Sequence, residues 1–313
     1  MTIFYGSEFL EHNPKSLENV RKKCNLEKPL AMEQAISILE EWIQKQDHFV
    51  KKDFHRGYLE RVIISTKGSI EKAKTRVDKL CTMRTNLPHF FEKCNVKRDF
   101  PKLHETYISV HMPKMTEDNN RIYIAKVTAK SLTPDVFLEA YQHSVILSEY
   151  MKLHDYSQGC HVIADFRDVN IMEMLSQMNI IEFRNVITLY LEGYGFGVKG
   201  VYVLSTSKLI HTFLNMVKPF ISAKIAERIR VLKDVESLQV YVPKRLLPEE
   251  YGGSQKSLLD IYDDWVEELS SEKHVTYTKE MRLARTNEAF RRKDKCQEDY
   301  MGMPGTFKIL SID

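Results

Sequence analysis

The chain has 313 residues, of which 43% are hydrophobic and 28% are charged, and these values exclude an intrinsically disordered protein. Its 46 Lys and Arg residues against 43 Asp and Glu residues give a net charge of +3, which excludes a uniformly basic nucleic-acid-binding protein. Five cysteines without C-x-x-C spacing predict reduced thiols, not a disulfide framework or a structural zinc site.

The N-terminal residues do not have the pattern of a secretory signal. Residues 1–14 already carry Glu8, Glu11 and His12, and they lack a basic segment followed by an apolar core. No apolar run in the chain reaches the roughly 18 residues that a membrane-spanning helix needs. We therefore expect a cytoplasmic protein that associates with membranes peripherally.

The first third of the chain is predicted to be helical. Apolar residues at i, i+3, i+4 and i+7 mark one face of a helix over residues 32–43, and a second helix begins near Asp53. A third follows Gly68 and ends before Pro88. These segments predict a small all-helical module over residues 15–95.

The middle of the chain alternates between strands and helices. Short β-branched runs predict strands at 121–127, 160–166, 200–205 and 238–242, and helical patterns separate them at 133–145, 173–192 and 208–233. This alternation predicts an α/β domain over residues 96–255, with a mostly parallel sheet flanked by helices. The strands are apolar on both faces, as expected for a sheet that is covered on both sides.

The last part of the chain divides in two. Residues 257–269 form an amphipathic pattern that predicts a helix, whereas 272–299 are dense in charges of both signs and predict a solvated helix or a loosely held arm. We treat 256–313 as a C-terminal helix and charged tail.

Motifs for catalysis are absent, so we expect no enzymatic activity, no cofactor and no metal site. The glycines of residues 193–197 follow a helix and open a strand, the reverse of a dinucleotide-binding loop, and therefore predict a helix cap and a turn. Asp165 ends a predicted strand, where a structural hydrogen bond is favoured over catalysis. An α/β enzyme that uses Asp165 and a nearby histidine remains the weakest alternative.

Residues 209–233 combine an apolar helical face with a basic side. Pro219 interrupts the helix, and Lys224 and Arg228 lie four residues apart. A broken helix of this kind suits a cover over an apolar cavity that also faces an anionic lipid surface. An ordinary edge helix with a solvated basic face is the alternative interpretation.

The same segment, followed by the L-P-E-E-Y-G-G sequence of residues 247–253, resembles the second half of a CRAL-TRIO lipid-binding domain. This family includes tocopherol-transfer and retinaldehyde-binding proteins. The helical first third resembles the N-terminal module of the family, and residues 302–308 resemble the tail of its invertebrate tocopherol-transfer-like subgroup. The resemblance covers about residues 20–313.

The resemblance implies an intracellular carrier that holds one small hydrophobic lipid, tocopherol-, retinoid- or sterol-like, under a gate helix at about residues 207–228 and exchanges it at membranes. The residues that it assigns to the lipid-binding cavity are Tyr141, Ser144, Ser148, Val162, Ala164, Val186, Leu189, Tyr190, Phe196, Val201, Ile210, Phe213, Leu214, Val217, Phe220 and Ile221. Docking to phosphoinositides on an anionic membrane is assigned to Lys199, Lys218, Lys224 and Arg228.

The chain departs from the family pattern at three places that concern docking and gating. Gly197 occupies a position where a basic residue is expected, residues 64–66 replace a basic R-x-R sequence, and residues 205–207 replace an Asn-x-Pro entry to the gate. The alternative function is therefore a phosphoinositide-binding module that is recruited to membranes and regulates without net lipid transfer. No nucleic-acid partner is expected.

Overall fold

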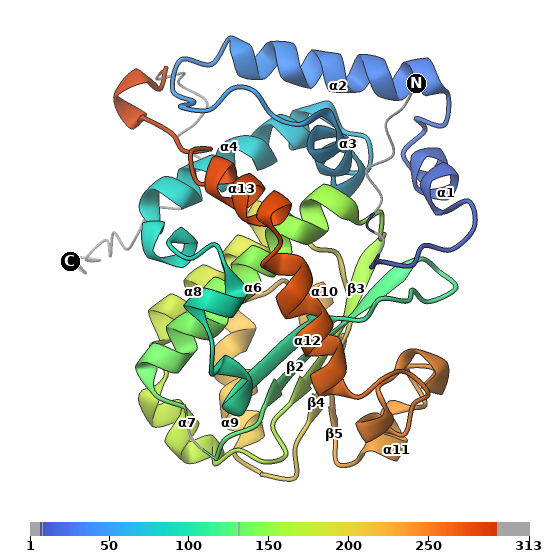
Figure 1. Ribbon diagram of the computed structural model, residues 1–313, viewed down its shortest axis with the longest axis vertical. Helices are drawn as coiled ribbons and strands as arrows, with labels where there is room; N and C mark the ends of the chain where they lie inside the picture. Colours follow the sequence, from blue (N-terminus) through green and yellow to red (C-terminus); the bar gives the residue numbers. More distant parts are fainter. Residues whose placement is uncertain (1–6, 8, 131, 293–313) are drawn as a thin grey trace, which may run out of the picture.

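A computed structural model describes residues 7, 9–130 and 132–292 of the chain. Its centre is a five-stranded sheet in the order β1-β2-β3-β4-β5 (Figure 1). Strand β1 (Tyr107–His111) pairs antiparallel with β2 (Asn120–Val127), and β3 (Gly159–Asp165), β4 (Val198–Leu204) and β5 (Ile229–Leu232) continue in parallel. The predicted mostly parallel sheet is therefore confirmed, with β1 as an antiparallel edge that the sequence analysis missed.

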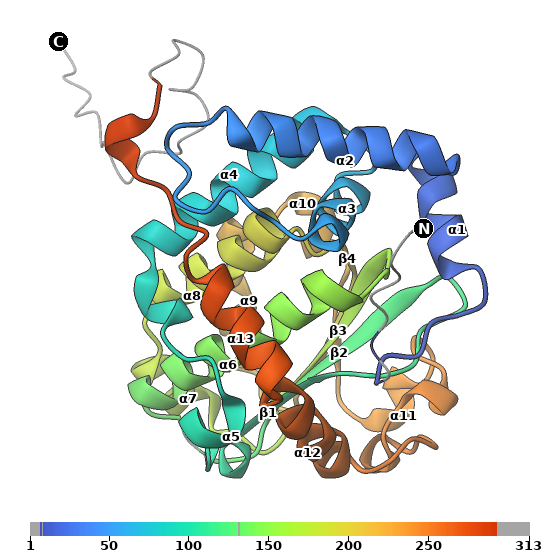
Figure 2. The same cartoon turned by 45° about the horizontal axis from the view of Figure 1, so that its top comes forward.

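Four helices form the module at one end of the molecule, as Figures 1 and 2 show. They are α1 (Ser16–Lys23), α2 (Pro29–Gln44), α3 (Arg56–Ser65) and α4 (Ile70–Asn86), followed by a 3-10 helix (Pro88–Phe91). The predicted apolar face of α2 is buried among α3 and α4. The Ser69 hydroxyl caps α4 by accepting from the Lys72 amide, and the chain leaves the helical path before Pro88.

The remaining helices surround the sheet. They are α5 (Val96–Asp99), α6 (Pro134–His154), α7 (Ile171–Gln177), α8 (Ile180–Thr188), α9 (Ile210–Val217), α10 (Ala223–Ala226), α11 (Val235–Leu238), α12 (Leu258–Leu269) and α13 (Glu272–Met281). Shorter 3-10 helices cover Leu103–Glu105, Lys218–Phe220, Lys244–Leu246, Glu249–Tyr251 and Glu288–Phe290, and a π-helix covers Leu189–Tyr194. Gly195 ends the π-helix with φ of 71°, which confirms the predicted cap and turn.

The fourth parallel strand lies elsewhere than predicted. Residues 238–242 are the end of α11 and a turn, because Asp234 caps that helix and Leu238 accepts from Val242 at helical spacing. The strand is β5, which we had placed inside the preceding helix. Side chains alternate between the two faces of this strand. Ile229 and Val231 are therefore partly buried, whereas Arg230 between them is exposed.

Two further predictions need correction. The helix predicted at 173–192 is divided at Asn179, whose side chain accepts from the amides of Ile181 and Glu182 and starts α8. We predicted a solvated helix or a loosely held arm from residue 272 onward. The described part of this segment begins with the helix α13, which is packed against the protein and buries His274 and Met281. Residues 293–313, with the tail motif at 302–308 and Cys296, lie outside the described residues.

Helices α12 and α13 run in succession from the sheet to the helical module (Figures 1 and 2). On α12, Trp265 donates through Nε1 to the carbonyl of His111 on β1, at 2.8 Å. Beyond α13, the amide of Val50 donates to the carbonyl of Arg285, and Arg291 pairs with Asp78 of α4 at 2.7 Å. We name residues 258–292 the C-terminal strap, because they fasten the module to the sheet.

None of the described helices combines the length and the apolar character that a membrane-spanning segment requires.

Candidate functional site

An apolar cavity of about 340 Å³ lies between the sheet and helices α6, α8 and α9. Its floor is built from alternate residues of neighbouring strands, which face the same side because side chains alternate along a strand. Val162 of β3 lies beside Tyr123 of β2 and Val201 of β4. In the next row, Ala164 lies beside Ala125. These two small side chains leave the floor low, and space remains between the sheet and the helices.

The gate segment (residues 207–228) closes one side of the cavity. Phe213, Leu214 and Val217 of α9 all line it, and each is less than a tenth exposed. The Phe213 ring lies 5.6 Å from the ring of Phe166 and 5.7 Å from that of Phe183, between centroids. The apolar face predicted for this segment is thus turned toward the cavity, and the helix is interrupted at Pro219 by a 3-10 turn.

Few polar groups reach the cavity, and they come from β1, β2, α6 and the π-helix. The hydroxyls of Tyr123 and Ser144 lie 3.3 Å apart, and Ser148 donates to the carbonyl of Ser144 at 2.7 Å. The buried hydroxyls of Tyr141 and Tyr190 have no hydrogen-bond partner within the described part of the chain. Burial raises the pKa of both phenols, so they remain neutral donors.

Most of the predicted cavity residues line this one space. They are Tyr141, Ser144, Ser148, Val162, Ala164, Val186, Tyr190, Phe196, Val201, Phe213, Leu214, Val217 and Ile221. Three lie outside the lining. Leu189 is buried in a cluster with Leu80 of α4. Ile210, at the start of α9, is buried in the core cluster on the sheet, and Phe220 is half-buried on the 3-10 turn.

Sequence reasoning missed a second group of lining residues. They include Tyr107, Tyr123, Ala125, Val127, Leu132, Phe137, Ala140, Leu147, Cys160, Phe166, Met174, Met178, Phe183, Ile187, Leu191, Val198, Val203, Ile225 and Ile229. Strand parity could have found part of this set, because residues two apart from Val162, Ala164 and Val201 face the same side. The residues of α7 and α8 carry no comparable signal.

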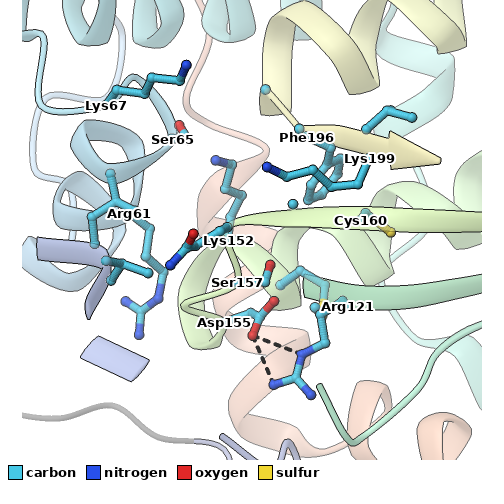
Figure 3. A pocket seen from close by; sticks show the side chains of 18 of the residues that line it. Arg61, Ser65, Lys67, Arg121, Lys152, Asp155, Ser157, Cys160, Phe196 and Lys199 are labelled. Atoms are coloured by element: carbon cyan, nitrogen blue, oxygen red, sulfur yellow. Dashed lines mark hydrogen bonds and ion pairs between the residues drawn. The ribbon is translucent and has the colours of Figure 1, made fainter. Parts of the chain in front are cut away.

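A second pocket, of about 530 Å³, lies where the amino ends of the parallel strands meet the helical module. Eight cationic side chains line it: Lys23, Arg61, Lys67, Arg121, Lys152, Lys199, Lys224 and Arg228. Asp155 is the one carboxylate in its described lining. We call this space the cationic pocket. Figure 3 shows Arg121 joined to Asp155, with Lys67, Lys152 and Lys199 reaching the pocket from three different elements.

The cationic pocket contains three of the four predicted docking residues. Lys199 stands at the start of β4, Lys224 on α10 and Arg228 just before β5. Burial and the repulsion of neighbouring cations, Arg228 first among them, lower the pKa of Lys199. Lys218 lies outside the pocket, where its Nζ donates to Asn215 at 3.1 Å.

The pocket also has a buried inner part that sequence reasoning did not find. Arg61 of α3, Arg121 of β2 and Lys152 of α6 are all less than a tenth exposed. Arg121 pairs with Asp155 at 3.0 Å. The apolar cavity and the cationic pocket share lining residues, among them Phe196, so the two spaces are adjacent.

Asp165 serves the fold. Its carboxylate accepts from Arg167 and, at 2.8 Å, from the hydroxyl of Tyr251 in the L-P-E-E-Y-G-G sequence. Although burial opposes ionisation, these hydrogen bonds hold the pKa of Asp165 below its ordinary value. The motif thus ties the chain after β5 to the end of β3. Among the described residues, no group of three or more His, Cys, Asp or Glu side chains is arranged to hold a metal ion.

A mostly parallel sheet with an apolar cavity between its face and a covering helix defines the class of α/β domain to which this part of the chain belongs. The CRAL/TRIO domain model matches residues 105–253, and the Pinta-like UBA domain model matches residues 28–100. The chain thus contains a CRAL/TRIO domain, which is preceded by a Pinta-like UBA domain.

Curated relatives include the proteins named alpha-tocopherol transfer protein-like from Homo sapiens and Pongo abelii, each 29% identical over 101 residues, and that from Mus musculus, 28% identical. The match covers 32% of this chain and 29% of each relative. The crystal structure of Sfh5 shares the fold, with a TM-score of 0.53 at 13% identity over 86% of this chain and 97% of that one.

Proposed function

We propose that this protein is an intracellular carrier that binds one small hydrophobic lipid in the apolar cavity and exchanges it at membranes. The observation that carries the proposal is the apolar cavity, whose floor is lowered by Ala125 and Ala164 and whose side is closed by the gate segment. A sterol- or tocopherol-sized molecule that buries on the order of 400 Å² gains roughly 10 kcal/mol of gross driving force. Such a ligand leaves slowly into water, so its release requires a membrane.

The polar groups of the cavity favour a cargo with one hydroxyl or carbonyl group. The unpartnered hydroxyls of Tyr141 and Tyr190 can donate to it, and Ser144 can accept or donate. A mostly apolar pocket with a few placed polar groups orients its ligand in this way. The tocopherol-like, retinoid-like and sterol-like classes all meet this description.

Membrane docking through the cationic pocket is the second part of the proposal. Lys199, Lys224 and Arg228 come together on one rim, where phosphoinositide headgroups can reach them. Each Lys or Arg near an anionic leaflet contributes about 1 kcal/mol, which suffices for reversible docking by three or four residues. Because α10 is itself part of the gate segment, docking at Lys224 brings the gate segment to the bilayer.

Native mass spectrometry of the protein, purified from lipid-containing cells, tests the carrier proposal. We expect a co-purified hydrophobic molecule, or uptake of one from a panel of tocopherols, retinoids and sterols. A protein that stays empty against the whole panel contradicts it.

The second candidate function is a membrane-recruited regulatory module without net transfer. The buried inner part of the cationic pocket favours it, because Arg61 and Lys152 lie deeper than a docking surface requires. A vesicle-to-vesicle transfer assay separates the two functions. Headgroup binding without lipid transfer supports the regulatory module, and transfer supports the carrier.

A further inference from the structure

Lys152 is a buried lysine that forms no ion pair within the described part of the chain. It lies near the end of α6 and is 6% exposed. Its ammonium nitrogen lies 6.0 Å from the centre of the Phe196 ring, a cation–π contact that does not supply a negative charge. A buried charge normally requires a partner of opposite charge, so the position of Lys152 calls for an explanation.

The two nearest carboxylates are engaged by other groups. Glu149, one turn earlier on α6, accepts from Arg84 and from the hydroxyl of Tyr194 at 2.6 Å. Asp155 pairs with Arg121 at 3.0 Å and lies 3.3 Å from the Nε2 of His12. Both carboxylates favour the ammonium form of Lys152 from a distance, but burial and two guanidinium groups outweigh them.

Cations face Lys152 from the module. Arg61 of α3 and Arg76 of α4 repel its ammonium form. Burial first, and then these two guanidinium groups, lower the pKa of Lys152 to about 7. The other charged groups around the pocket are Lys23 of α1, Lys67 after α3, Arg121 of β2, Lys199 of β4, Lys224 of α10 and Arg228 before β5. The titratable groups there are His111 of β1 and the thiols of Cys24 and Cys160, whose pKa values burial raises.

We propose that Lys152 is the innermost contact of the cationic pocket for a multiply phosphorylated anion, and that it takes up a proton when that anion binds. This proposal rests on the docking part of the proposed function. A space of about 530 Å³ with eight cations and one carboxylate accommodates a ring that bears several phosphates. The phosphates supply the negative charge that Lys152 lacks, so its ammonium form is stabilised in the complex.

Because binding is coupled to proton uptake by Lys152, the affinity for the anion is expected to change with pH in one direction. The free protein holds Lys152 partly neutral near pH 7, whereas the complex holds it charged. Affinity therefore falls as pH rises through the range where the free amine has lost its proton, by about tenfold from pH 6 to pH 8. His111 does not contribute, because burial lowers its pKa to about 3 and it stays neutral throughout.

Titration calorimetry with inositol trisphosphate, in buffers of different ionisation enthalpy, measures the protons taken up on binding. The same titration with phosphatidylcholine vesicles, with and without phosphatidylinositol bisphosphate, forms the second arm. Uptake of a proton in either arm supports the Lys152 contact. The arm with the tighter binding identifies the source of the phosphates, a free anion or a lipid headgroup.

Three variants make the assignment specific. Lys152→Met is expected to weaken binding about tenfold and to abolish the proton uptake. Lys152→Arg keeps the charge at all pH values and is expected to bind without pH dependence beyond that of the ligand. Lys279→Met removes an exposed lysine of α13, which lines neither pocket, and is expected to match the wild type.

The inference is overturned if wild type and Lys152→Met bind the anion equally and exchange the same number of protons. All other titratable groups of the protein and of the ligand are present in both, so only Lys152 can cause a difference. Binding without any proton uptake also overturns it, and leaves docking intact. Absence of binding in both arms overturns docking together with this inference. The carrier function is tested separately, by the hydrophobic cargo.

Discussion

Phe213 is the side chain through which the gate segment meets the cavity, in contact with the rings of Phe166 and Phe183. We expect Phe213→Asp to abolish ligand retention, because it puts a carboxylate against an apolar space. Thr212→Asp adds the same charge to the exposed face of α9 and is expected to retain the ligand. Mass spectrometry of the bound lipid compares the two, and equal retention would contradict the role of Phe213.

Lys152 also affects stability in the absence of a ligand. Its pKa is lowered in the folded protein, so the folded state binds fewer protons than the unfolded state between about pH 7 and pH 10. Lys152→Met is therefore expected to raise the free energy of unfolding by about 4 kcal/mol near pH 7, and the gain disappears as pH rises toward the ordinary pKa of lysine. Urea denaturation across that range measures it. A gain that grows with pH would contradict the argument.

At the scale of elements, the sequence predicted the helices and strands whose pattern of apolar residues is visible within a short stretch of chain. The helices α2, α4 and α12 were found because their apolar residues recur at helical spacing, and the strands β2, β3 and β4 because they are short β-branched runs. The pattern for α6 predicted only 133–145, because the rest of that helix is buried on all sides. The helix that we predicted at 208–233 extends too far, because its last part is strand β5. Ile225 and Ile229 fit helical spacing, yet Ile229 starts β5 because its backbone pairs with β4, a contact between distant segments that no local pattern contains.

The candidate site was predictable to a similar degree. Residues on strands and on the gate segment could be assigned because their neighbours share a face. The inner part of the cationic pocket could not be predicted, because Arg61 and Lys152 belong to helices 91 positions apart in the chain and meet only in the folded protein. Leu189 was misplaced because the π-helix turns it away from the cavity toward α4.

The C-terminal strap contributes directly to the core of the helical module. Met281 is 3% exposed and packs among the buried residues of α2, α3 and α4. We expect Met281→Ala to lower the free energy of unfolding by about 2–4 kcal/mol, because a cavity replaces a buried side chain. Leu283→Ala, two residues further on and exposed, is the matched control and is expected to change stability by less than about 0.5 kcal/mol. Chemical denaturation of both variants tests the strap.

On the scale of the whole molecule, the cationic pocket and the apolar cavity divide two tasks. Lys224→Ala combined with Arg228→Ala is expected to weaken binding to vesicles that contain phosphoinositide and to leave lipid binding in the cavity unchanged. The loss is expected to shrink as salt is added, because exposed charges are screened. Vesicle sedimentation at low and high ionic strength measures this. Normal docking of the double variant at low salt would contradict the assignment of that rim.

The strap has a consequence for the order of synthesis. Met281 and Ala284 complete the core of a module whose helices begin near residue 16. The helices that are synthesised first therefore cannot bury their apolar faces fully until nearly the last described residues have been made. Domains commonly fold as units during translation, from the N-terminus onward. Here the first unit closes only after the sheet has been made, and a nascent chain arrested before α13 would expose an unfinished apolar surface to the cell's chaperones.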